Sequence, residues 1–406
     1  MTTLQLRKSI GRSHLRSGLL LVPLAIATFG LTLIFNLVAA SAAPLIVTAN
    51  ADTLWRQYGF NAAHTSFNNS ETILNRSNVS QLKLLWSGTM FRPPATSPIL
   101  GFNSIFVAND GRVRALQEQS GQRKWVRLSC SGEGTQQPAL GHGLLLVGDG
   151  GGDLAAYEPA TGQQIWCDDE SGSITSAPAV ADDTVYITNG TDAVAVDQAT
   201  GLRRWTFTPA DFSPLTQTPA IANGMVFVTG GQAVFALDQA TGHKIWRHNV
   251  LQVQAHISAP SVANGLVYVG GDSLYAFSAA DGHLVWRNRD IGVNVTTPAI
   301  AENKVFVNAE DPNFGVFAVD AATGVILWNS GDEYESTLTV ANGVVYSITD
   351  VGDLLMFDTR NGAFLGSIAD PNGKPFFNGF GAQPIVANGT VYVSTGDRVD
   401  AFHVGP

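Results

Sequence analysis

The sequence predicts an all-β fold: an eight-bladed β-propeller of four-stranded antiparallel blades, closed by pairing of an N-terminal strand with the C-terminal blade. A tryptophan series, a proline series and a displaced N-terminal strand together predict it. A period of about 40 residues filled with short β-type runs is typical of propellers, because each repeat is one small sheet that must bury its faces against its neighbours. The tryptophans of the series stand 39 to 42 residues apart, at Trp86, Trp125, Trp166, Trp205, Trp246, Trp286 and Trp328.

Each tryptophan from Trp125 onward follows a predicted hairpin turn, whereas Trp86 has no such turn before it. Residues 193–197 alternate as a strand up to Asp197, residues 199–201 (Ala-Thr-Gly) form the turn, and residues 202–207 carry Trp205 on the next strand. Glycine supplies the positive φ of such a turn, while Asp and Thr side chains bond local backbone amides. We expect the tryptophans to fill the space between neighbouring blades, which is a structural role. The turn glycines stand four residues before the tryptophans, at Gly121, Gly162, Gly201, Gly242, Gly282 and Gly324.

A proline marks the start of nearly every innermost strand. Proline cannot donate to a ladder, so it belongs at a strand start or a sheet edge, and the strand facing the axial channel is such an edge. Each repeat therefore reads as inner, second, third and outer strands. The prolines of this series are Pro98, Pro138, Pro178, Pro219, Pro260, Pro298 and Pro384.

Counting these units predicts eight blades. Six units end at a tryptophan, and a seventh ends near Gly366 without one. Residues 384–402 supply three more strands, and residues 82–87 supply the missing fourth from the other end of the chain. A seven-bladed ring is the alternative, but it would leave an unpaired strand at each end.

The first fifty residues differ from the rest of the chain. Four basic residues (Arg7, Lys8, Arg12 and Arg16) precede an apolar run from about residue 17 to 40, followed by small residues. This order is typical of an export signal. The run is also long enough to span a bilayer, so an uncleaved anchor is the alternative. We expect an extracytoplasmic protein, either secreted or anchored to the cell membrane by this segment.

The domain assignment follows from these patterns. Residues 1–43 are assigned to a signal peptide or signal anchor, 44–80 to an N-terminal strap or linker, and 81–406 to the propeller. The strap is polar with scattered aromatic residues and has no steady period. We expect it to pack along the outside of the ring.

The net charge limits the classes of partner that the protein can bind. The formal net charge is −10, and without the four basic residues of the N-terminal segment it becomes −14. An acidic chain with no basic stripe argues against nucleic acid and anionic membrane surfaces. We expect a monomer.

The two cysteines, Cys130 and Cys167, fall toward one rim of a blade. We therefore expect a disulfide in an oxidising compartment, with two unpaired thiols as the alternative.

The repeat resembles that of the pyrroloquinoline-quinone (PQQ) propeller superfamily. Residues 195–205 and their near copy 236–246 carry the resemblance, which extends over roughly residues 82–403. The stretch from Trp55 to Gly59 also resembles the entry segment of these proteins. The resemblance implies an eight-bladed propeller. The superfamily includes quinone-dependent alcohol and sugar dehydrogenases, BamB-type outer-membrane assembly factors and binding modules, and this chain is most similar to the non-dehydrogenase, BamB-like branch.

The residues that the resemblance associates with dehydrogenase chemistry are missing from the sequence. Those enzymes have a disulfide between adjacent cysteines and a Ca²⁺ ion held by Glu, Asn and Asp, whereas the two cysteines here are 37 positions apart. We assign no catalytic residue, no metal ligand and no cofactor. PQQ and Ca²⁺ stay open as alternatives without motif support, and carboxylates such as Asp149 and Asp153 are explained by glycine-rich turns.

Geometry indicates where a binding site would lie. The connections that enter the inner strands emerge around one mouth of the channel, here called the loop face, and their polar and aromatic side chains suit a protein or a polar ligand. The alternative is that they cap strand ends. We therefore predict a non-catalytic binding scaffold, with a PQQ-dependent dehydrogenase and a BamB-like assembly factor as alternatives. The candidate residues are Gln136, Gln217, His256, Asn294, Tyr334, Glu335 and Phe380.

Overall fold

The computed structural model describes residues 54–90, 96–170, 172–250, 257–310, 314–331, 336–349, 352–369, 383–395 and 397–405. All of them belong to one compact unit spanning residues 49–406. The predicted signal or anchor segment, residues 1–43, lies outside the described residues. In the described part of the chain, no helix has the length and apolar character needed to cross a bilayer.

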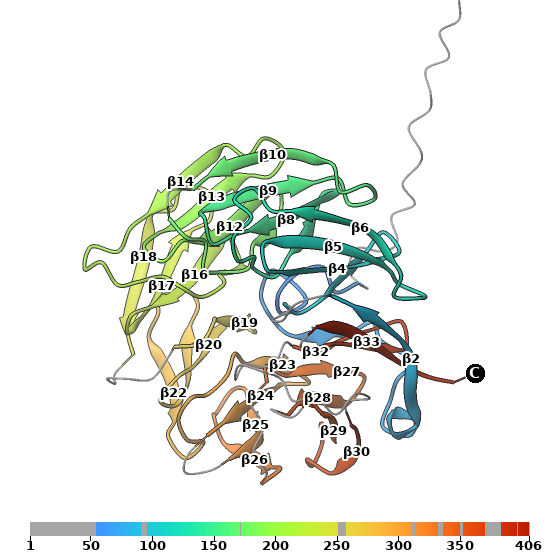
Figure 1. Ribbon diagram of the computed structural model, residues 1–406. Coiled ribbons are helices and arrows are strands. Elements are labelled where there is room, and N and C mark those ends of the chain that lie inside the picture. Colours follow the sequence, from blue (N-terminus) through green and yellow to red (C-terminus); the bar gives the residue numbers. More distant parts are fainter. Residues whose placement is uncertain are drawn as a thin grey trace, which may run out of the picture. The chain divides into compact units, whose positions relative to one another are not determined.

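The described strands form eight sheets arranged as the blades of a propeller, which confirms the predicted fold class (Figure 1). Each sheet runs from a short inner strand to an outer strand in antiparallel order. The inner strands have three residues each, because the chain leaves the channel again at once through a tight turn. They are β3 (Ile99–Gly101), β7 (Ala139–Gly141), β11 (Ala179–Ala181), β15 (Ala220–Ala222), β19 (Ser261–Ala263), β23 (Ala299–Ala301), β27 (Thr339–Ala341) and β31 (Ile385–Ala387).

The middle strands of each blade are the most completely buried. The second strands are β4 (Ser104–Asn109), β8 (Leu144–Gly148), β12 (Thr184–Thr188), β16 (Met225–Gly230), β20 (Leu266–Gly270), β24 (Lys304–Ala309), β28 (Val344–Ile348) and β32 (Thr390–Thr395). The third strands are β5 (Arg112–Gln117), β9 (Asp153–Tyr157), β13 (Ala193–Asp197), β17 (Ala233–Asp238), β21 (Leu274–Ser278), β25 (Gly315–Asp320), β29 (Leu354–Asp358) and β33 (Arg398–Val404).

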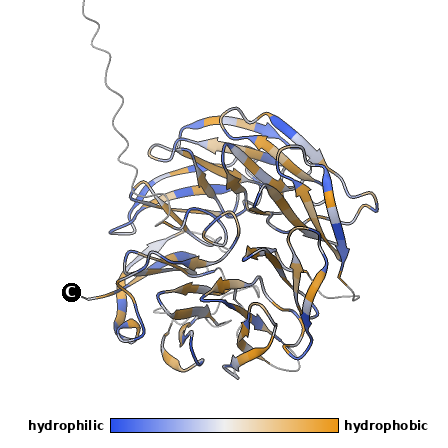
Figure 2. Cartoon of the chain, turned by 180° about the vertical axis from the view of Figure 1, so that it is seen from behind, coloured by the Kyte–Doolittle hydropathy of each residue, from blue (hydrophilic) through white to orange (hydrophobic). Residues whose placement is uncertain are grey.

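The outer strands carry the tryptophans and are partly exposed. They are β6 (Arg123–Leu128), β10 (Gln164–Asp169), β14 (Arg203–Phe207), β18 (Lys244–Asn249), β22 (Leu284–Asn288), β26 (Ile326–Asn329), β30 (Phe364–Ile368) and β2 (Leu82–Thr89). Hydrophobic colour is frequent on the strands toward the inside of the ring, while hydrophilic segments are frequent toward its periphery and in the turns (Figure 2). This distribution follows from blade packing, since the two faces of each sheet are covered by neighbouring sheets.

The N-terminal strand β2 completes the last blade, as the count of strands predicts. It pairs antiparallel with β33, from Leu82 opposite Val404 to Thr89 opposite Arg398 (Figure 1). The pairing gives the C-terminal sheet its fourth strand and joins the two ends of the described chain in one blade. The ring is therefore held closed by hydrogen bonds between its ends.

The tryptophans lie between neighbouring blades, which is the packing role predicted for them. The indole N–H of each of the seven donates to a backbone carbonyl of the next blade, at 2.9 to 3.2 Å. The turn glycine of that next blade lies against the ring: a Cβ on Gly242 would come 2.6 Å from Cδ2 of Trp205. Trp86 of the last blade makes the same contact with Gly121 of the first, so ring closure uses the ordinary interface.

The interface without a tryptophan is filled differently. The short 3-10 helix η2 (Val79–Gln81) packs beside β30, the outer strand of the seventh blade. Val79 is fully buried in an apolar cluster with Leu82 and Met356. An aliphatic side chain from the N-terminal segment therefore occupies this space between the seventh and eighth blades.

The prediction that residues 44–80 pack outside the ring is wrong for the segment 55–68, here called the channel strap. Its backbone carbonyls accept hydrogen bonds from inner-strand amides, as between Trp55 and Leu100 at 2.7 Å, and between Thr65 and Ile300 at 2.7 Å. Residues Phe67–Asn68 form strand β1, parallel to β27. The strap therefore lines the inside of the ring, because the inner strands present unpaired edge amides there.

Candidate functional site

Three of the predicted loop-face residues are described, and each makes local hydrogen bonds. The Gln136 side chain donates to the Ile174 carbonyl at 3.1 Å, and Asn294 donates to Glu310 Oε2 at 2.7 Å. The carbonyl of Gln217 accepts from the Thr188 hydroxyl at 3.2 Å. They lie in the connections that enter the second, fourth and sixth blades, and their hydrogen bonds tie those connections down. His256, Tyr334, Glu335 and Phe380 lie outside the described residues, so the site as a whole stays a prediction.

A repeated hydroxyl cap at this face was missed at the sequence level. Two residues before the inner-strand proline position, a Ser or Thr side chain accepts a hydrogen bond from a backbone amide at the end of the second strand. The signal was in the sequence, because a hydroxyl residue recurs at a constant distance from the proline. The pairs are Thr96 with Ala108, Ser176 with Thr188, Ser258 with Gly270, Thr296 with Asn308, and Ser336 with Ile348.

The channel strap brings titratable side chains into the interior. Nδ1 of His64 lies 3.0 Å from the Pro260 carbonyl, and the His64 ring meets the Tyr58 ring edge to face at 5.0 Å. The Tyr58 hydroxyl donates to Thr297 Oγ1 at 2.9 Å. Burial raises the pKa of Tyr58 and lowers the pKa of His64 to about 4. His64 is therefore neutral at pH 7, with Nδ1–H donating to the Pro260 carbonyl and Nε2 unprotonated.

A cavity of about 500 Å³ lies beside the strap at the opposite mouth from the loop face. Its floor contains the largely buried side chains of Phe60, Leu140 and Val180, and its rim includes Arg56 and Asp182. The volume and the mixed lining fall within the range of small-molecule sites. Sequence reasoning missed this cavity because it placed the strap outside the ring.

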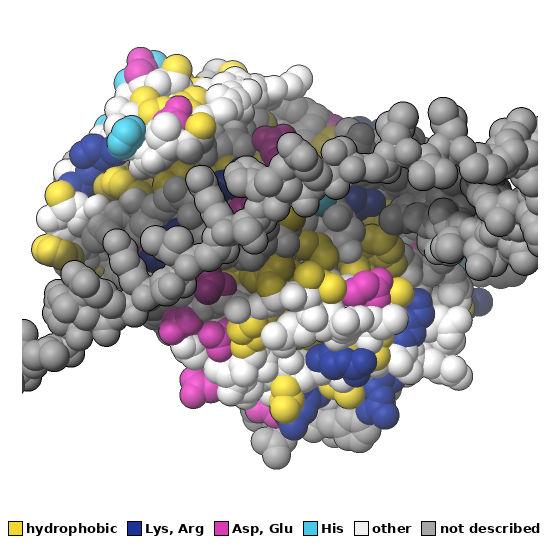
Figure 3. Space-filling model, turned by 90° about the horizontal axis from the view of Figure 1, so that it is seen from above, with side chains coloured by type: hydrophobic (Ala, Val, Ile, Leu, Met, Phe, Trp, Pro, Cys, Tyr) yellow, Lys and Arg dark blue, Asp and Glu magenta, His cyan; other side chains and the backbone are white. Residues whose placement is uncertain are grey.

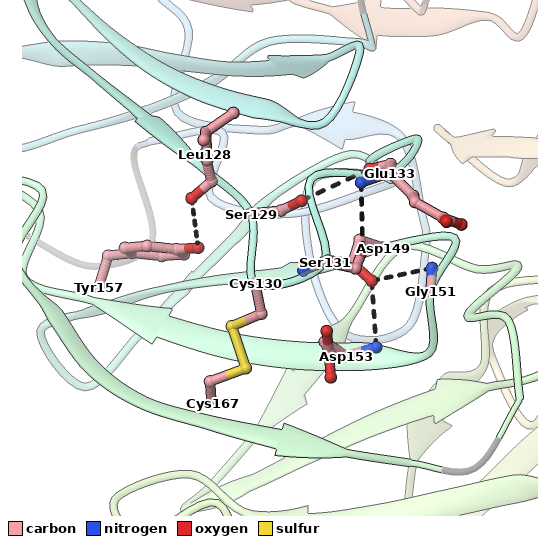
Figure 4. The surroundings of a disulfide bond; sticks show 10 residues. All are labelled: Leu128, Ser129, Cys130, Ser131, Glu133, Asp149, Gly151, Asp153, Tyr157 and Cys167. Atoms are coloured by element: carbon pink, nitrogen blue, oxygen red, sulfur yellow. Dashed lines mark hydrogen bonds between the residues drawn. A yellow bond between two sulfur atoms is a disulfide. The ribbon is translucent and has the colours of Figure 1, made fainter.

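Cys130 and Cys167 form a disulfide bond between the connection entering the second blade and β10 (Figure 4). The same connection is held by Asp149, a buried residue whose carboxylate accepts from the amides of Ser131, Gly151 and Asp153, each at 3.1 Å. The covalent bond and these hydrogen bonds act on one segment. We infer that they set the position of the loop-face connection that contains Gln136.

Other carboxylates stabilise the turns between the third and outer strands of the blades. The Arg204 guanidinium and the Thr200 hydroxyl hold the pKa of Asp197 at about 2. Asp238 and Asp320 accept from the threonine three residues later in the same way, so this is a repeated turn.

The surface carries charges of both signs. Figure 3 shows acidic and basic side chains together among the coloured residues of one side of the molecule.

The described residues offer one grouping of metal-ligand type, formed by Cys130, Asp153 and Cys167. Both sulfur atoms of this group are in the disulfide, so a single carboxylate is left to bind an ion. The residues present also do not fit the quinone site that the superfamily implies, because both cysteines of the chain are joined across 37 positions. We therefore derive no reaction step through either group.

The fold and the interior together define an eight-bladed propeller of the PQQ-like class. Three overlapping matches, residues 52–232, 150–264 and 230–403, fit the family described as outer membrane protein assembly factor BamB, and the chain belongs to that PQQ-like propeller family. A solved structure of BamB from Moraxella catarrhalis superposes with a TM-score of 0.65 at 16% identity, covering 79% of this chain and 99% of that chain. At this identity the superposition shows the fold alone.

Two curated relatives resemble parts of the chain equally well. A 1-butanol dehydrogenase (cytochrome c) of Thauera butanivorans is 29% identical over 155 residues, or 34% of this chain and 22% of the relative. An outer membrane protein assembly factor BamB of Legionella pneumophila is 29% identical over 113 residues, or 27% of this chain and 29% of the relative. The chain thus matches less than a third of either relative and is related to both kinds of protein.

The disulfide between Cys130 and Cys167 indicates an extracytoplasmic location. Stable disulfides form in oxidising compartments such as the periplasm or the cell exterior.

Proposed function

We propose that this protein is a non-catalytic binding scaffold that holds a protein or a polar ligand at a mouth of its ring. The observation that carries the proposal is the channel strap, which covers the inner edges of the blades with the chain's own residues. Binding surfaces are then left at the two mouths.

The loop face is the mouth that we propose for a partner. The connection of residues 208–219 carries Gln217 and also Phe212, whose side chain is 83% exposed. The Asp211 side chain next to it is paired with Arg247. An exposed aromatic ring on a braced connection is typical of a contact residue, because ordering it on binding costs little entropy.

A paired capture experiment tests this proposal. The wild-type protein, a loop-face variant (Phe212→Ser with Gln217→Ala) and a control (Leu202→Ala) are each used to recover partners from the native cell envelope. Leu202 is 67% exposed on the turn between β13 and β14, away from the loop face. We expect the wild type and the control to recover the same partner and the loop-face variant to lose it. No recovery by the wild type, or equal recovery by all three, contradicts the proposal.

A PQQ-dependent dehydrogenase is the second candidate, favoured by the similarity to the 1-butanol dehydrogenase. Purified protein incubated with PQQ and Ca²⁺ is assayed for quinone absorbance and for dye-linked oxidation of alcohols and sugars. Saturable uptake with turnover would replace the scaffold proposal by this one. If the protein shows neither quinone uptake nor turnover, the scaffold proposal is favoured over the dehydrogenase.

We further propose that residues 1–43 direct the chain out of the cytoplasm and either are cleaved or anchor it. The apolar run from about residue 17 to 40 supports export. Fractionation of cells and sequencing of the mature N-terminus separate secretion from anchoring. A mature chain found in the cytoplasm contradicts both.

A further inference from the structure

The channel strap contacts the inner strand of every blade. The amide of the middle residue of seven inner strands donates to the strap, and the eighth inner strand accepts a bond from it. Fourteen residues of strap thus meet eight blades in sequence order. The pairs, blade by blade, are Trp55 with Leu100, Arg56 with Leu140, Gln57 with Val180, Ala62 with Ile221, Ala63 with Val262, Thr65 with Ile300, Ser66 with Val340, and Asn68 with Val386.

Two carboxamide side chains act where the strap backbone turns away from the blades. Gln57 Oε1 accepts from the Val180 amide at 2.7 Å, and Gln57 Nε2 donates to the Val180 carbonyl at 3.2 Å. Asn68 Nδ2 donates to the Val386 carbonyl at 2.7 Å. A carboxamide has the same donor and acceptor pair as a peptide group, so these side chains replace backbone pairing at the third and eighth blades.

The strap is held in place by burial of its side chains as well as by hydrogen bonds. Trp55, His64 and Ser66 are fully buried, and the Gln383 side chain donates to the Ser66 hydroxyl at 2.9 Å. A segment held by edge hydrogen bonds, with selected side chains in pockets, is the general form of a peptide bound to sheet edges.

The chain that follows the strap is anchored on its own. The carboxylate of Glu71 accepts from the amides of Leu74 and Gly389, and Arg76 pairs with Asp358 at 2.9 Å. Asn69, between the two anchored parts, is exposed. The strap is therefore connected to the blades through one exposed point and is otherwise held by non-covalent contacts.

We propose that the inner edge of the ring is a peptide-binding groove, which the strap occupies in cis, and that the groove accepts the same segment as a separate peptide, such as the strap of a second copy of this chain. The partner class is a peptide that can adopt the turns of the strap, starts with a large apolar side chain and has carboxamides at the positions of Gln57 and Asn68. This property is independent of the partner at the loop face.

The test uses the full chain with a protease recognition sequence inserted between Asn69 and Ser70. After cleavage of the folded protein, we expect the N-terminal fragment to stay with the ring during gel filtration. A fluorescent synthetic peptide of residues 54–69 is then added, and its incorporation is followed by anisotropy. The Gln57→Ala peptide should bind at least tenfold more weakly, because it loses two hydrogen bonds. The Asn69→Ala peptide, altered at the exposed position, should bind like the wild-type sequence.

Loss of the fragment on the column, no uptake of labelled peptide, or equal binding of the Gln57→Ala peptide overturns the proposal. Hydrogen exchange of the uncleaved chain gives a second measurement if the cleaved protein aggregates. The Gln57→Ala substitution in the full chain should speed exchange of the Val180 amide and leave the Ile221 amide protected. Unchanged protection at Val180 likewise overturns it.

Discussion

At the scale of single residues, one pair repeats around the ring: a tryptophan and the turn glycine of the next blade. The glycine has φ near +70° and offers no side chain, so the indole ring lies directly on its Cα. The indole N–H reaches a carbonyl of the same turn, as from Trp205 to Gln239 at 3.0 Å. Turn geometry and packing between blades thus depend on the same glycine.

Substitution of two glycines separates these effects. Gly242 has φ +72° and a Cβ there would meet Trp205, whereas Gly265 has φ +75° with open space around it. We expect Gly265→Ala to lower the free energy of unfolding by about 1 kcal/mol, from backbone strain alone. Gly242→Ala should lose about 1–3 kcal/mol more, because the methyl group overpacks the interface. Urea unfolding measures both, and equal losses would contradict the packing role.

The buried His64 predicts a pH dependence. Its pKa in the folded chain is about 4, below the usual value near 6.5, so below pH 6.5 the unfolded chain binds a proton that the folded chain does not. This term lowers stability as the pH falls from 6.5 to about 4, by on the order of 3 kcal/mol. Asn tolerates the positive φ of His64 (+56°) and can still donate to Pro260.

We therefore expect the His64→Asn variant to lose less stability than the wild type over this pH range. Denaturant unfolding at pH 7, 5.5 and 4 measures the difference between the two chains. If the unfolding free energies of the wild type and the variant fall in parallel with pH, the pKa of His64 is not lowered in the folded chain.

At the scale of elements, the connections between blades are braced by side chains. The hydroxyl caps of Thr96, Ser258 and Thr296 hold connections to the ends of second strands. The connection entering the second blade has a covalent brace in addition, the bond between Cys130 and Cys167. The described loop-face residues are therefore held in place before any partner arrives.

Removal of the disulfide should destabilise the protein without changing its fold. We expect the double variant Cys130→Ser with Cys167→Ser to lose about 2–4 kcal/mol of unfolding free energy, because the unfolded chain is no longer cross-linked. Thermal unfolding with and without reductant measures this. Reductant should lower the midpoint of the wild type and leave the double variant unchanged. A wild type insensitive to reductant would contradict the stabilising role.

At the scale of the whole molecule, two segments that precede the first blade in sequence complete the ring. Strand β2 supplies the outer strand of the last blade, and the channel strap bonds to all eight inner strands. Both come from the N-terminal part of the described chain. We infer that the ring is complete only when this part has docked.

If closure uses an ordinary interface, the closing tryptophan should matter as much as the others. Trp86→Ala and Trp246→Ala each remove a buried ring with one hydrogen bond to the next blade. We expect each variant to lose about 3–5 kcal/mol, by the usual cost of truncating a buried aromatic side chain. Unfolding midpoints of the two variants provide the comparison. A loss below about 1 kcal/mol for Trp86→Ala alone would indicate that the ends of the ring contribute little.

The candidate site was less predictable than the fold. The place of Gln136 in a loop-face connection follows from strand order, but its bond to Ile174 depends on how two adjacent connections fold. The cavity beside Arg56 and Phe60 could not be predicted, because no period in residues 55–68 indicates that their partners are eight separate strands.

The sequence by itself determined the blade number, the order of strands in a blade and the closure by residues 82–87. Those features repeat, and a repeated pattern of turn glycines, prolines and tryptophans leaves few ways to bury each sheet. Only the tertiary structure decided where the strap lies, because its contacts join single residues to strands as far as 318 positions away. Such contacts depend on edge amides that become available only once the ring has formed.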